Sequence, residues 1–108
     1  MSTIQLQLVT AQLLSSTPSS VYTTPGLTVA SITAASVNNP TGSPVAVNFY
    51  RVPSAGSADD STLIASINVP AGICTNVYAL VNVKFDANTQ IYASGDGCYI
   101  NISGTQTV

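Results

Sequence analysis

Hydrophobic and polar residues alternate along most of this chain, which is the period of a β-strand with one buried face. Ile4, Leu6 and Leu8 alternate with glutamines, and Val45, Val47 and Phe49 alternate with less apolar neighbours. Helical spacing is not evident in any segment, so we expect no helix. The pattern predicts strands over residues 4–8, 21–23, 27–35, 45–50, 63–69, 74–85 (bent), 91–93 and 99–102.

Residues that favour turns separate these strands. Pro25-Gly26, Pro70-Ala71-Gly72, Asp86 to Thr89 and Gly95 to Gly97 are short turn signals, and residues 38–44 and 53–60 are longer polar loops. Short strands with turns every 8 to 15 residues or so indicate an all-β fold. We expect a single antiparallel β-sandwich or jelly-roll-like barrel of about seven or eight strands. The 108 residues form one domain overall, with residues 1–20 as an N-terminal strand or arm plus loop and 21–108 as the sandwich.

The composition is unusually poor in charge. Only 6% of residues are charged and the net charge is −2, whereas about a quarter of the residues of an average protein are charged. Serine and threonine together supply 27 residues, so hydroxyl groups cover much of the surface. Molecules with this surface repel one another weakly, which favours homo-oligomers and assembly. Two cations, Arg51 and Lys84, are too few to bind nucleic acid.

Membrane insertion is not expected either. No stretch approaches the roughly 18 apolar residues that a spanning helix needs. Residues Met1 to Leu8 lack a basic region and a continuous apolar run, so they do not read as a secretory signal. We therefore expect synthesis in a cytoplasm.

The side chains that most enzymes use are missing. The chain has no histidine and no glutamate, so a serine or threonine nucleophile lacks its usual base. Lys84 could serve as a base, but it alternates with Val83 and Phe85, as a solvent-facing strand residue does. We predict that the protein is not an enzyme, and that it has no catalytic residue and no cofactor.

The sequence also favours the absence of a metal site. Its four carboxylates, Asp59, Asp60, Asp86 and Asp96, all fall in predicted turns, where aspartate commonly accepts hydrogen bonds from backbone N–H groups. Their spacing does not match a calcium loop. Gly95-Asp96-Gly97 lacks the lysine and following helix of a phosphate-binding loop, and reads as a hairpin turn.

Cys74 and Cys98 allow at most one disulfide. The simpler interpretation is two buried thiols. If both faced one layer of a sandwich, they could pair in an oxidising setting.

The aromatic residues leave two roles open. The five tyrosines could form a platform on which sugars stack, or they could be half-buried and interface residues of the sheets. Because the chain has no tryptophan, the structural role is favoured; the set is Tyr22, Tyr50, Tyr78, Tyr92 and Tyr99.

One segment carries a resemblance to a known group of proteins. Residues 21–32, VYTTPGLTVASI, resemble the opening of small structural proteins of tailed bacteriophages. An asparagine-containing turn (38–40), a strand (45–51), a VPSAGSA loop (52–58), a VPAG turn (69–72) and two closing strands follow in the same order. The similarity covers most of the chain from Val21 onward; Asp86-Ala87-Asn88 departs from the acidic turn of the pattern.

The resemblance implies a virion protein without catalytic residues. The first expectation is a capsid decoration (cement) protein that oligomerises, binds the major capsid protein or other virion proteins, and stabilises the shell. Its N-terminal segment, with Ile4, Leu6 and Leu8, is the expected interaction arm. The alternatives are a tail, neck or tail-fibre structural subunit, and a carbohydrate-binding module.

Overall fold

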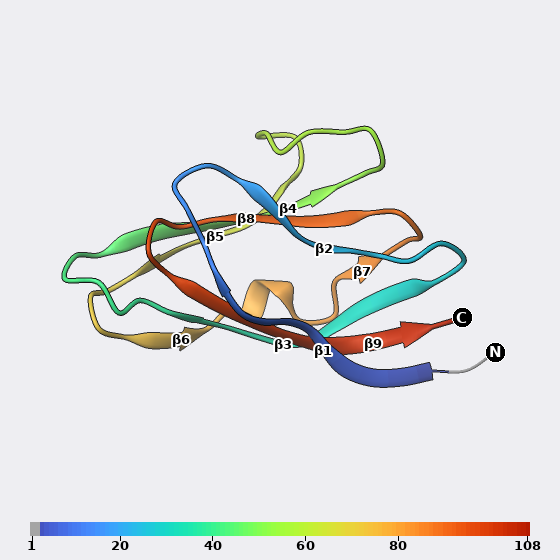
Figure 1. Ribbon diagram of the computed structural model, residues 1–108, viewed down its shortest axis with the longest axis horizontal. Helices are drawn as coiled ribbons and strands as arrows, with labels where there is room; N and C mark the ends of the chain where they lie inside the picture. Colours follow the sequence, from blue (N-terminus) through green and yellow to red (C-terminus); the bar gives the residue numbers. More distant parts are fainter. Residues whose placement is uncertain (1–2) are drawn as a thin grey trace.

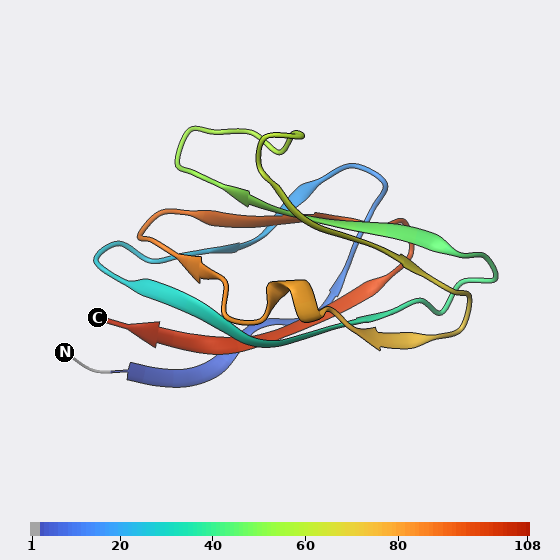
Figure 2. The same ribbon diagram turned by 180° about the vertical axis from the view of Figure 1, so that it is seen from behind.

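Two antiparallel sheets lie face to face in the computed structural model, which describes residues 3–108 (Figures 1 and 2). Sheet A has the order β1-β9-β3-β6, and β7 also pairs with β3. Sheet B has the order β2-β8-β4-β5. The elements are β1 (Thr3–Leu13), β2 (Ser19–Thr23), β3 (Val29–Asn38), β4 (Val45–Val52), β5 (Leu63–Val69), β6 (Cys74–Asn76), the 3-10 turn η1 (Tyr78–Leu80), β7 (Lys84–Phe85), β8 (Gln90–Ser94) and β9 (Tyr99–Thr107).

The strand order is that of a jelly roll. The chain passes repeatedly from one sheet to the other, so β1, β3 and β9 lie in sheet A while β2, β4 and β8 lie in sheet B. Two sheets interleaved in this way define the jelly roll among β-sandwiches, and the short strand β7 adds a fifth strand to sheet A. The predicted all-β sandwich is therefore confirmed.

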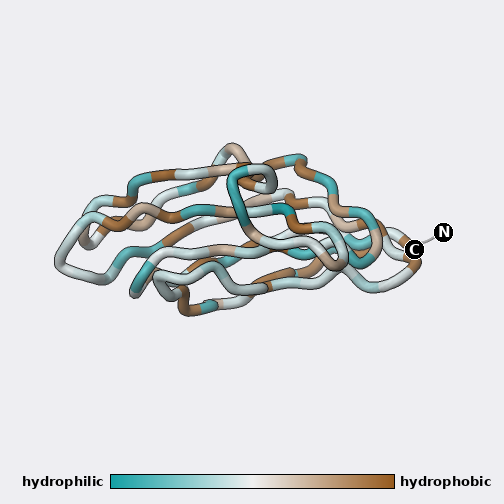
Figure 3. Tube along the Cα trace, turned by 90° about the horizontal axis from the view of Figure 1, so that it is seen from above, coloured by the Kyte–Doolittle hydropathy of each residue, from teal (hydrophilic) through white to brown (hydrophobic). Residues whose placement is uncertain are grey.

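The core lies between the two sheets and follows the alternation of the strands. Phe49 and Phe85 are fully buried, and so are the isoleucines that β3, β8 and β9 direct inward: Ile32, Ile91, Ile100 and Ile102. Hydrophobic positions recur along the strands in Figure 3. Since each fully buried Ile or Phe side chain contributes about 1.5–3 kcal/mol, this layer supplies the main driving force for folding.

The segment from Cys74 to Phe85 corrects one prediction. The sequence predicted one bent strand here, but the chain forms β6, the turn η1 and then β7. Val77 and Leu80 are buried while Val81 is 38% exposed. The apolar residues of this segment therefore do not alternate between a buried and an exposed face, as they would in one strand. Asn82 adopts the left-handed conformation at φ 70°, which ends the extended path, and asparagine tolerates that conformation better than most residues.

The predicted N-terminal arm is part of the sandwich. β1 pairs with β9 along most of its length, from Thr3 opposite Thr107 to Leu13 opposite Tyr99. Leu8 packs against the core and Val9 belongs to it, so the segment is held by both hydrogen bonds and burial. The pairing also brings the two ends of the described chain side by side (Figure 1).

Candidate functional site

The outer face of sheet A is hollowed by three adjoining depressions. The largest, about 480 Å³, lies over Gln5, Gln7, Thr33 and Ser103. A second of about 140 Å³ shares Ser103 with it, and a third of about 180 Å³ shares Thr33. The second and third also share Asn76. Together they form one continuous surface, which we call the sheet A hollow and define by Gln5, Gln7, Thr33, Asn76, Tyr78, Asn101 and Ser103. Apolar residues, among them Leu6, Ala34, Ala35, Val77 and Val81, also line it.

Irregular pairing gives sheet A this shape. The register between β1 and β9 shifts between Gln7 and Val9, and the register between β3 and β9 shifts between Ile32 and Ala34. Bulges of this kind bend a strand and increase its twist. Since the two shifts flank the same part of β9, near Ser103, they bend the sheet at the centre of the hollow.

Hydrogen bonds fix several polar groups of the hollow. The Asn101 Oδ1 accepts a bond from the Ala11 backbone N–H at 2.8 Å, which leaves the NH2 group of that carboxamide as a donor. The Asn76 Nδ2 donates to the Tyr78 hydroxyl at 3.2 Å, which leaves the Asn76 carbonyl oxygen as an acceptor. Tyr78 is 77% exposed, and its hydroxyl accepts this bond beside the hollow.

Sheet A also has a long edge strand without charge. β1 forms one edge of the sheet, and its 11 residues include no Asp, Glu, Lys, Arg or Pro. The edge strands of sheet B, β2 and β5, also have none. Proteins commonly place charges or proline on such edges to prevent pairing with other chains. Bulges interrupt β1 only after Gln7, so Thr3 to Gln7 is a regular and open edge.

Apolar side chains are exposed near the same end of sheet A. Leu27, in the turn between β2 and β3, is 91% exposed; Ile4 is 53% exposed and Val29 is 45% exposed. Leu27 also has a left-handed backbone at φ 61°, a conformation that costs a residue with a Cβ roughly 1–2 kcal/mol. An exposed leucine in this conformation therefore contributes little to the stability of the fold.

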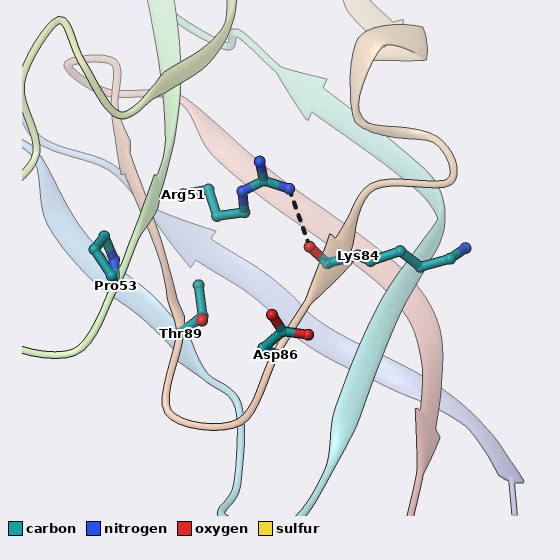
Figure 4. Close-up of a pocket in the computed structure, with 5 residues that line it drawn as sticks. All are labelled: Arg51, Pro53, Lys84, Asp86 and Thr89. Atoms are coloured by element: carbon teal, nitrogen blue, oxygen red, sulfur yellow. Dashed lines mark hydrogen bonds between the residues drawn. The ribbon is translucent and has the colours of Figure 1, made fainter.

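Both cations of the chain lie at an open side of the sandwich. Arg51, Lys84, Asp86 and Thr89 line a hollow of about 410 Å³ there. Figure 4 shows the Arg51 guanidinium directed toward the Lys84 backbone, while the Lys84 side chain extends away from the hollow. The Arg51 Nη1 donates to the Lys84 carbonyl oxygen at 3.2 Å. This bond joins β4 of sheet B to β7 of sheet A, so Arg51 links the two layers.

Lys84 does meet a serine, as a serine–lysine site would need. Its Nζ donates to the Ser31 Oγ at 3.0 Å across the β3–β7 pair. Lys84 is exposed, as the sequence predicted, whereas a lysine that acts as a base is usually desolvated. The pair therefore reads as a cross-strand surface contact; the prediction that the protein is not an enzyme stays a prediction.

The aspartates lie in turns, as expected. The Asp59 Oδ1 accepts a hydrogen bond from the Ser61 backbone N–H at 2.9 Å. The Ser61 hydroxyl, the Ser61 N–H and further bonds from Ser57 and Thr62 hold the pKa of Asp59 below its usual range. Within residues 3–108, no three side chains of the His, Cys, Asp or Glu type come together as a metal site requires.

Asn39 has a role that the sequence did not indicate. It lies in the predicted polar loop over residues 38–44, but its side chain is fully buried. Its Nδ2 donates to the carbonyl oxygens of Ser43 and Val69, both at 2.9 Å, and its Oδ1 accepts from the Thr41 N–H at 3.0 Å. The side chain thus joins the β3–β4 loop to the end of β5.

The two cysteines are free thiols in different environments. Cys98 is buried, as predicted, whereas Cys74 is exposed, so the expectation of two buried thiols is wrong for Cys74. Cys74 lies on the edge strand β6 opposite Asn38, where no second layer covers it. Burial, with a smaller contribution from Asp96, raises the pKa of the Cys98 thiol.

The tyrosines do not share one surface. Tyr50 and Tyr92 are cross-strand neighbours in sheet B, and the Tyr22 hydroxyl accepts a bond from the Gln106 Nε2 of sheet A at 2.5 Å. Tyr99 lies on β9, and only Tyr78 borders the sheet A hollow. A platform of all five is therefore excluded, and Tyr78 is the one placed to contact a ligand there.

Comparisons with known proteins support the fold. No protein-family model and no curated protein matches the chain. A solved structure from the endospore appendages of Bacillus, a novel family of disulfide-linked pili, has a similar fold, with a TM-score of 0.57 at 15% identity. The match covers 98% of this chain and 88% of that chain. In the part of our chain that the structure describes, no helix has the length and hydropathy to cross a membrane.

Proposed function

We propose that this protein is a non-enzymatic structural subunit of a tailed bacteriophage virion, and specifically a capsid decoration protein. The observation that carries the assembly role is the uncharged, regular edge of β1 from Thr3 to Gln7. Its free backbone N–H and C=O groups can pair with a strand of another subunit. The assignment to a phage is based on the sequence resemblance from Val21 onward.

The exposed apolar residues give this interaction an anchor. Ile4, Leu27 and Val29 lie near the end where the edge is regular. Burial of such side chains in a partner supplies free energy, while the paired edges fix the orientation. The partner is the capsid shell or a neighbouring copy of this chain.

Leu27→Asn separates assembly from folding. Asparagine accepts the left-handed conformation of this turn more readily than leucine, so the isolated variant should be as stable as the original protein or more stable. Its binding to shells of the major capsid protein should weaken about tenfold if Leu27 is an anchor. Cosedimentation with the shells measures binding, and thermal melting measures folding.

Ile4→Lys tests the edge itself. A lysine on an edge strand opposes pairing with another strand, so this variant should bind shells weakly. Ser54→Lys is the matched control, because it adds the same charge to an exposed loop. Equal binding by both variants and the original protein, or no binding by any of them, would contradict the proposal.

A subunit of a fibre is the second candidate, favoured by the structural similarity to disulfide-linked pili. The position and copy number of the chain in purified particles distinguish the two. A copy number comparable to that of the major capsid protein supports decoration of the shell. A much smaller number supports a position in a tail fibre, the tail or the neck. Purified filaments that run as a ladder on non-reducing gels, and lose it in Cys74→Ser, would support the fibre.

A further inference from the structure

We infer that the sheet A hollow is a binding site for a neutral polysaccharide. This site adjoins the β1 edge used in the proposed assembly, because Gln5 and Gln7 belong to both, and it would add a second activity to the subunit. Three features of the hollow lead to this inference: its polar groups, its lack of charge and its exposed tyrosine.

The polar groups of the hollow match the hydroxyls of a sugar. Amides and hydroxyls both donate and accept hydrogen bonds, as sugar hydroxyls do. Asn101 presents an NH2 donor and Asn76 a carbonyl acceptor, because the bonds to Ala11 and Tyr78 hold their other ends. The hollow therefore offers oriented partners over a continuous surface rather than at one point.

The lack of charge selects among polymers. Within residues 3–108, no charged residue lines the three depressions, and β1, β3, β6 and β9 contain none. Lys84, on β7 of the same sheet, is the cation nearby, and its Nζ is bonded to Ser31. A nucleic acid or a sulfated glycan requires cations for most of its affinity. An uncharged chain of sugars has no such requirement.

Tyr78 supplies the apolar contact that a sugar ring needs. Tyr78 is 77% exposed, and its hydroxyl accepts a bond from Asn76 at the border of the third depression. An aromatic ring with a polar tip can pack against the C–H face of a ligand while its hydroxyl stays hydrogen-bonded. Because so little of Tyr78 is buried within the chain, its replacement should leave the fold intact.

The test is affinity electrophoresis of the full chain in native gels that contain dextran, soluble starch, galactomannan or hydroxyethyl cellulose. We expect at least one of these neutral polymers to slow migration, and heparin, an anionic control, to have no effect. Tyr78→Ala should weaken the retardation about tenfold, whereas Tyr78→Phe, which keeps the ring, should largely retain it. Tyr92→Ala is the matched control, because Tyr92 is a half-buried tyrosine of sheet B.

Three results would overturn the inference. The first is migration that none of the neutral polymers changes, and the second is retardation that Tyr78→Ala leaves unchanged. The third is a change in self-association, measured by sedimentation, that accompanies Tyr78→Ala without any effect on sugar binding; this would make the hollow an interface between copies. Thermal melting of each variant confirms that it is folded, and shell binding measured in parallel tests the assembly role independently.

Discussion

At the scale of single residues, the structure separates polar groups that support the fold from those that face solvent. The side chain of Asn39 is buried and bonds to four other residues, while its neighbour Asn38 is exposed at the end of β3. The thiols of Cys98 and Cys74 differ in the same way. Adjacent or chemically identical side chains therefore have different energetic roles, which gives each variant a natural control.

Asn39→Ala should lower the free energy of unfolding by about 2–4 kcal/mol. The change leaves the buried carbonyl of Val69 without its donor and also removes the bonds to Ser43 and Thr41, and each buried unsatisfied group costs about 1–3 kcal/mol. Asn38→Ala should change stability by less than about 0.5 kcal/mol. Urea unfolding of both variants measures the difference, and equal stabilities would contradict the role assigned to Asn39.

The raised pKa of Cys98 predicts a loss of stability at alkaline pH. The unfolded thiol releases its proton near pH 8.5 or so, while the folded thiol retains it because burial disfavours the thiolate. The unfolded state therefore binds fewer protons, and stability falls as the pH rises through this range, with a slope of at most about 1.4 kcal/mol per pH unit. Urea unfolding between pH 8 and 10 or so should show a shallower slope for Cys98→Ala than for Cys74→Ala, which keeps the buried thiol.

At the scale of strands, the sequence predicted the fold well wherever one face is buried. The alternation over Val45, Val47 and Phe49 found β4 because its inward residues are buried and its outward ones are less so. The same alternation misled over residues 77–85, where a left-handed Asn82 and the turn η1 interrupt the chain. The alternation of apolar and polar residues does not show where the chain turns away from a strand.

The sheet A hollow could not be predicted from the sequence for a related reason. It depends on two register shifts between strands that are about 70 to 100 residues apart, and pairing register over such separations follows from packing. Tyr78 was predicted as a candidate, but as one of five; only the folded chain shows that it is the tyrosine that lines the hollow.

Gly104→Ala tests how closely β9 and β3 approach. A Cβ at Gly104 would overlap the Ser31 carbonyl oxygen and would lie 2.8 Å from the Leu8 Cδ1. Backbone atoms cannot move aside as a side chain can, so we expect a loss of about 1–3 kcal/mol or more. Gly42→Ala, with no atom within 4 Å of the new Cβ, is the control. Chemical unfolding that shows similar stability for both would mean that the strands can separate at little cost.

At the scale of the whole molecule, the scarcity of charge sets how it associates. With two cations and four anions in the sequence, long-range repulsion between copies is small. Contacts made by apolar side chains and backbone edges are therefore the main forces that we expect between subunits.

Self-association should accordingly depend little on simple salt. Raising NaCl from about 0.05 M to about 0.5 M shortens the range of electrostatic forces, and we expect the dissociation constant to change by less than about threefold. Ammonium sulfate should strengthen association, because it favours burial of apolar surface. Sedimentation velocity at matched protein concentrations tests both statements; a steep dependence on NaCl would show that charges dominate.

The pairing of Thr3 with Thr107 has a practical consequence. Since residues paired across an antiparallel ladder have Cα atoms only about 4.5–5.5 Å apart, a short glycine-rich linker could join the two ends of the described chain. New ends could then be opened in the exposed loop at Gly56, as circular permutation commonly tolerates. We expect the permuted chain to keep its β-type circular dichroism spectrum and melt cooperatively. A cargo fused at the new ends would then leave from the loop between β4 and β5, away from the edge strand β1.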